Sequence, residues 1–93
     1  MLEPLSFKLE DFVSRGMLRV LKVISQNGSC NISMLSRKTG LNHGSCDRHI
    51  KKLLALGLVS ERRYNNIRWI RPEFISLTIE FRRGMRPKMT VEA

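Results

Sequence analysis

Basic side chains gather in two stretches of the sequence, one near residue 50 and one between residues 62 and 71. The cations in these stretches are Arg48, Lys51, Lys52, Arg62, Arg63, Arg68 and Arg71. Arginine accounts for eleven of the seventeen basic residues of the chain. Its planar guanidinium can bind a phosphate group or the edge of a guanine through two hydrogen bonds at once. These residues therefore favour recognition of a polyanion.

The charge of the whole chain supports the same chemistry. Seventeen basic and eight acidic residues give a net charge of +9 and an isoelectric point near 10.6. The excess is +3 over residues 1–46 and +6 over residues 47–93. A charge bias of this kind indicates the partners of a protein rather than its fold. Since residues 47–93 carry the larger excess, we expect this later half of the chain to face the anion.

Residues suited to catalysis or to metal binding are few. The chain has two histidines and no Ser-His-Asp or Cys-His spacing, no Gly-rich phosphate loop and no carboxylate pair suggestive of a shared pocket. Cys30 and Cys46 form neither a disulfide framework nor, with His43 and His49, a four-ligand zinc site. We read both cysteines as buried thiols, while a redox bridge within or between chains stays open. The sequence predicts a non-enzyme without cofactor, metal or small-molecule ligand.

The composition, with 42% apolar and 27% charged residues over 93 positions, fits one small globular domain. No stretch approaches the roughly 18 apolar residues of a membrane span, and no export signal is visible at the amino terminus. We therefore expect a soluble, cytoplasmic and nucleoid-associated protein with no membrane contact. The predicted domain covers residues 1–84, and residues 85–93 are predicted to be a flexible tail.

Apolar spacing predicts the helices that would position the basic residues. An amino-terminal helical region is expected over residues 5–26, and the spacing leaves open whether Gly16 kinks one helix or separates two. Two further helices are expected over residues 32–56, joined by a turn after Gly40. In the second of these, residues 43–56, one buried stripe is expected opposite a polar and basic face, formed by Cys46, Ile50, Leu53 and Leu54.

The second half of the chain predicts a hairpin followed by an ambiguous segment. Residues 58–71 read as two strands around a turn at Tyr64–Asn66, since asparagine tolerates a positive φ. Residues 72–83 alternate as a strand would, with Ile75, Leu77, Ile79 and Phe81 apolar. The end signals, from Pro72 to Gly84, favour a helix, and we predict a carboxy-terminal helix there.

Residues 32–71 resemble winged helix-turn-helix DNA-binding domains of the MarR and ArsR type, mainly in the run LNHGSCDRHIKKLLALGLVSERR. The positions that carry the likeness are Leu41, Asn42, Cys46, Arg48, His49, Ile50, Leu53, Gly57, Leu58 and Val59. The resemblance implies a mainly α fold with a small β-hairpin, an α+β winged helix-turn-helix. It also implies a homodimer that binds double-stranded DNA, and we assign the dimer contacts to the amino-terminal and carboxy-terminal helices.

Roles for individual residues follow from the resemblance and from groove geometry. The first turns of a helix in the major groove reach base edges, and its later basic residues reach phosphates. The residues predicted to read bases are His43, Gly44, Ser45, Asp47 and Arg48. Those predicted to contact the DNA backbone are Asn42, Lys51, Lys52, Arg37 and Lys38. Those predicted for the wing, on the adjacent backbone or minor groove, are Arg62, Arg63, Tyr64, Asn65, Asn66 and Arg68.

Asp47 departs from the pattern, because the resembling domains usually carry a neutral residue there. Its carboxylate could accept a hydrogen bond from a cytosine amino group or repel phosphate. The basic helix face could also be only a solvated surface. Three hypotheses remain: a sequence-specific transcription regulator, which we favour, a non-specific chromatin-type protein, and a protein-interaction module of the same fold.

Overall fold

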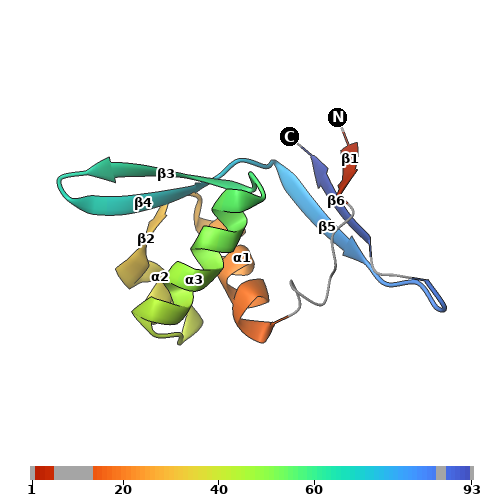
Figure 1. Cartoon of the computed structure of the whole chain (residues 1–93), viewed down its shortest axis with the longest axis horizontal. Helices are drawn as coiled ribbons and strands as arrows, with labels where there is room; N and C mark the ends of the chain where they lie inside the picture. The colour runs from red at the N-terminus through yellow and green to blue at the C-terminus, as the bar shows by residue number, and fades with distance from the viewer. Residues whose placement is uncertain (1, 6–13, 86–87, 93) are drawn as a thin grey trace.

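The computed structural model describes residues 2–5, 14–85 and 88–92 (Figure 1). Within these ranges the chain forms three helices, α1 (Arg15–Asn27), α2 (Ile32–Thr39) and α3 (His43–Ala55). The strands are β1 (Leu2–Leu5), β2 (Cys30–Asn31), β3 (Val59–Tyr64), β4 (Ile67–Pro72), β5 (Ser76–Glu80) and β6 (Lys88–Glu92). Three helices with small antiparallel sheets confirm the predicted α+β class.

Helix α1 begins later than the sequence predicts. Ser14 is extended, and its side chain accepts a hydrogen bond of 3.1 Å from the backbone N–H of Met17, which caps the helix. A continuous helix over residues 5–26 is therefore wrong, and Leu5 belongs to β1. The predicted helical stretch between them, residues 6–13, lies outside the described residues. Gly16 neither kinks nor divides α1, because it lies in the first turn.

The helices α2 and α3 lie within the range predicted for them, and side chains fix the turn between them. Asn42 caps α3 by accepting a 2.8 Å hydrogen bond from the Ser45 N–H. In the turn itself, the Ser36 hydroxyl donates to the Leu41 carbonyl at 2.6 Å. Gly40 ends α2 with a φ of 77°, in the left-handed region. These contacts set the angle at which α3 leaves α2.

The first sheet has the strand order β2-β4-β3 and contains the predicted hairpin. Asn65 and Asn66 form its two-residue turn with φ values of 52° and 63°, as a twisted hairpin requires. Strand β2 pairs only with the middle of β4, at Trp69 and Ile70. The part of the hairpin nearer the turn therefore projects beyond the third strand, as Figure 1 shows.

The predicted carboxy-terminal helix over residues 72–83 is wrong. Pro72 ends β4, and residues 76–80 form β5, which pairs with β6 in a second sheet of order β1-β6-β5. The alternating apolar residues form one face of β5, as in an ordinary half-buried strand. On this face, which packs on the core, Leu77 lies opposite Val91 and Ile79 opposite Met89. Residues 88–92 are thus part of the sheet, and the predicted flexible tail over 85–93 is wrong there.

Gly40 provides a test of the turn between α2 and α3. Nothing lies within 4 Å of a Cβ added there, so Gly40→Ala changes only the backbone preference. We expect it to lower the free energy of unfolding by about 1 kcal/mol, because a left-handed conformation strains an alanine. Urea unfolding of the variant measures the loss. Gly44→Ala is the control: Gly44 is helical and open, so no loss is expected. Equal losses for both variants would contradict this account.

Candidate nucleic-acid interface

Helix α3 has one apolar face in the core and one basic face in solvent. Cys46, Ile50 and Leu53 are completely buried. On the opposite side Arg48, Lys51 and Lys52 are exposed. Because residues three and four apart share a helix face, the apolar contacts determine which side chains a partner can reach.

The first turn of α3 is open and can be approached closely. His43 and Gly44 are exposed, and the nearest atom to a Cβ added at Gly44 would be the Asn42 side-chain oxygen at 3.5 Å. Arg48 donates a 3.0 Å hydrogen bond to the Ser45 hydroxyl, which holds its guanidinium beside this turn. The first turn contains no acidic residue, so the partial positive charge of the helix start faces solvent uncompensated by a carboxylate.

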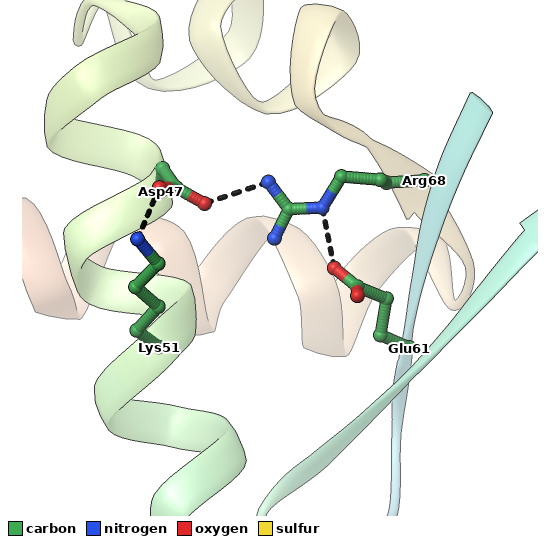
Figure 2. A network of polar contacts seen from close by, with 4 residues as sticks. All are labelled: Asp47, Lys51, Glu61 and Arg68. Carbon is green, nitrogen blue, oxygen red and sulfur yellow. Dashed lines mark hydrogen bonds and ion pairs between the residues drawn. The ribbon is translucent and has the colours of Figure 1, made fainter. Parts of the chain in front are cut away.

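Asp47 binds cations of the protein through both of its carboxylate oxygens. Its Oδ1 accepts a 2.6 Å hydrogen bond from Nη1 of Arg68 on β4, and its Oδ2 lies 3.1 Å from Nζ of Lys51. The Nε of Arg68 also donates to Oε1 of Glu61 on β3, at 2.5 Å. Figure 2 shows these four side chains joined between α3 and the hairpin. We call the Asp47–Arg68–Glu61 contacts the helix–wing bridge.

Asp47 and Arg68 of the helix–wing bridge are both held in their charged forms. Hydrogen bonds from Arg68, and then from Lys51, lower the pKa of Asp47 below its ordinary value. Hydrogen bonds to Asp47 and Glu61 raise the pKa of Arg68. The side chains of Asp47, Arg68 and Glu61 are between 26% and 28% exposed, so solvent reaches them but does not separate them.

The residues predicted for the wing divide between the two faces of the hairpin. The turn residues Asn65 and Asn66 are exposed at its tip. Arg63 lies opposite Arg68, on the face that carries Ile70 toward the helices. Arg62 lies on the other face, opposite Trp69, as does Tyr64, opposite Ile67. A flat surface cannot contact all of the predicted wing residues at once.

The two cations predicted on α2 lie in its last turn and are exposed. Lys38 donates a 2.8 Å hydrogen bond to the side-chain oxygen of Asn27 at the end of α1. The structure thus brings the α3 residues and Arg68 together, while Lys38 points to another helix.

His49 lies at the edge of the core, against the start of α1. A Cβ added at Gly16 would come within 2.7 Å of its Nε2, so the absence of a side chain at Gly16 permits this approach. Burial, followed by the nearby cations Arg48 and Lys52, lowers the pKa of His49. The neutral imidazole is therefore the form that the fold favours.

Both cysteines are buried and unpaired with each other. Burial raises the pKa of the Cys30 thiol, which disfavours the reactive thiolate. In residues 2–5, 14–85 and 88–92, no group of three or more His, Cys, Asp or Glu side chains could hold a metal ion. None of the described helices is both long and apolar enough to cross a membrane.

Residues 17–60 match the model of a protein family described as winged helix-turn-helix DNA-binding. The chain contains a winged helix-turn-helix domain. In this domain α2 and α3 form the helix-turn-helix, and the β3–β4 hairpin follows it in the place of a wing. The comparisons with curated proteins and with solved structures give no match. The likeness to the MarR and ArsR type within this class stays a prediction.

Sequence reasoning missed the helix–wing bridge, although the sequence contains a signal for it. With the turn at Asn65–Asn66, Arg63 must face Arg68 directly, and like charges in such a pair repel. Glu61 lies two positions from Arg63 on the same face and can offset that repulsion. Asp47, on α3, also binds Arg68, across the gap between the helix and the wing.

The pKa of His49 makes stability depend on pH. The unfolded chain takes up a proton near pH 6.5, whereas the folded state resists it. The neutral form of His49 therefore contributes fully to the free energy of unfolding above about pH 6.5. This contribution is lost as the pH falls toward the lower pKa of His49 in the folded state. We expect His49→Gln to reduce this loss, as measured by urea unfolding at a series of pH values. His43→Gln, with its exposed side chain, should leave it unchanged. Parallel curves for wild type and His49→Gln would refute the assignment.

Proposed function

We propose that the protein is a sequence-specific transcription regulator that binds double-stranded DNA. The recognition helix α3 enters the major groove, and the wing lies on the adjacent backbone or minor groove. The match of residues 17–60 to the winged helix-turn-helix DNA-binding family supports DNA as the partner. The observation that carries the proposal is the exposed basic face of α3 beside a first turn with no acid and an open glycine.

The structure supports separate roles for the residues of α3. Base reading falls to His43, Gly44, Ser45 and Arg48, at the end of the helix that a groove would receive first. Asp47 is left out of this group, because both of its oxygens already bind cations. The proposed backbone contacts are Asn42, Lys51, Lys52 and Arg37 from the helices, with Asn65 and Asn66 from the tip of the wing and Arg62 and Tyr64 from one of its faces. Lys38, which binds Asn27, and Arg63, on the other face of the hairpin, are left out.

The first experiment selects bound duplexes from a random DNA pool. A regulator returns one enriched motif at moderate salt. Uniform binding of the pool would favour the chromatin-type protein, since the charge of +9 suffices for phosphate contacts. Failure to retard any duplex at low salt would favour a protein-interaction module.

Two substitutions then separate base reading from phosphate binding. Arg48→Ala should weaken binding to the selected duplex by about 1–3 kcal/mol, with a smaller effect on random duplexes. Lys52→Ala should weaken both alike and reduce the salt slope by about 1. Lys52 serves better than Lys51, which also binds Asp47. Fluorescence anisotropy titrations measure both effects, and Arg83→Ala, between β5 and β6, is the matched charge control. Equal losses on both duplexes for Arg48→Ala would refute base reading.

We further propose that the protein acts as a homodimer. The predicted carboxy-terminal helix does not exist, so the support comes from the apolar surface between α1 and β5. An open cavity of about 360 Å³ lies there, and its rim includes Leu18 and Ile75, which are 38% and 75% exposed. Burying such residues in a second copy removes apolar area from water.

Sedimentation equilibrium tests the dimer. Wild type is expected at twice the chain mass of 10.8 kDa, and Ile75→Asp at the mass of one chain, because a charge in the apolar contact is costly. Thr78→Asp is the control, since Thr78 is exposed on the polar face of β5. A wild-type protein that stays monomeric, alone and on the selected duplex, would overturn this proposal.

A further inference from the structure

The wing depends on α3 for its position near the turn. Strand β2 supports β4 only at Trp69 and Ile70, so Arg68 is the first residue beyond the third strand. The Arg68–Asp47 contact is the one side-chain hydrogen bond between α3 and the wing in the part of the chain that the structure describes. This contact therefore determines how far the projecting part of the hairpin lies from the recognition helix.

The guanidinium of Arg68 is suited to fixing a direction as well as a distance. It binds Asp47 through Nη1 and Glu61 through Nε, two donors held rigidly in one plane. Because Glu61 belongs to β3 and Arg68 to β4, the plane is anchored to both strands of the wing. A lysine ammonium would keep the charge but could not hold two carboxylates in a fixed relative orientation.

We propose that the helix–wing bridge is a specificity device: Asp47 and Arg68 are positioning residues that set the gap between α3 and the wing without touching DNA. This inference rests on the proposed function, because the gap matters only if both elements bind one duplex. Base reading requires α3 to sit at one register in the groove, and the wing fixes that register through its own backbone contacts. A loose wing would still bind phosphate but would no longer favour one sequence.

The bridge also explains an acid on a surface that should face a polyanion. If Asp47 acted only as an unwanted negative charge, removing it would strengthen binding to every duplex. If it positions the wing, its removal weakens binding to the selected duplex while random duplexes bind as well as before or better. The two accounts therefore predict opposite signs for the same substitution.

The experiment measures the ratio of affinities for the selected and random duplexes in four proteins: wild type, Asp47→Asn, Arg68→Lys and the double variant. Each substitution is nearly isosteric or keeps its charge, and circular dichroism with thermal unfolding checks the fold. We expect each single variant to lower the ratio about tenfold, and the double variant to lower it no further, because one contact is lost in all three. Arg83→Lys, at an exposed arginine between β5 and β6, is the matched control and should keep the ratio.

The outcomes separate this inference from the proposed function. A wild type that prefers one duplex, with variants that keep its ratio, overturns the helix–wing bridge alone. Asp47→Asn binding that strengthens equally on both duplexes does the same, since it assigns Asp47 to charge only. Additive losses in the double variant also contradict a shared contact. A wild type that prefers no duplex overturns the proposed function, and the bridge with it.

Discussion

The buried stripe of α3 is the constraint on which the rest of the structure depends. Cys46, Ile50 and Leu53 have no exposed surface, so the rotation of the helix about its own axis is fixed by packing. Any other rotation would bury Arg48 or Lys52 and expose the stripe, at a cost of several kcal/mol for an unpaired buried charge. The identity of the outward side chains is thus decided by contacts on the inward side.

The polar contacts around α3 refine what the apolar contacts impose. Thr39, buried at the end of α2, donates to the Leu35 carbonyl and accepts from the Leu41 N–H, so the turn before α3 has little freedom. On the other side, Arg68 joins α3 to the wing. Net charge alone would treat Arg68 as one more cation for phosphate, but its two acidic partners make it part of the scaffold.

The helix-turn-helix and the wing could be predicted from the sequence because their signals are local. Asn42 as a cap, Gly40 as a stop and Asn65–Asn66 as a hairpin turn each act within a few residues. The strand β5 could not be predicted in this way, since its identity depends on pairing with β6, 8 to 16 positions further along, in a segment that the sequence predicts to be a tail. Without β6, the alternation at Leu77 and Ile79 competes with helix end signals, and pairing decides between them. The site shows the same division: the outward face of α3 follows from spacing, whereas the role of Asp47 needs the three-dimensional position of Arg68.

The pairing of β1 with β6 has a consequence for the order in which the protein is built. Leu2 lies opposite Glu92, so this sheet joins segments from the two far ends of the sequence, which lie side by side in Figure 1. The helices and the β3–β4 hairpin lie within residues 15–72, so the contacts among them involve neither the first strand nor the last. The first strand must instead wait until residue 92 has left the ribosome. During that interval β1 is an unpaired strand edge, open to association with another nascent chain.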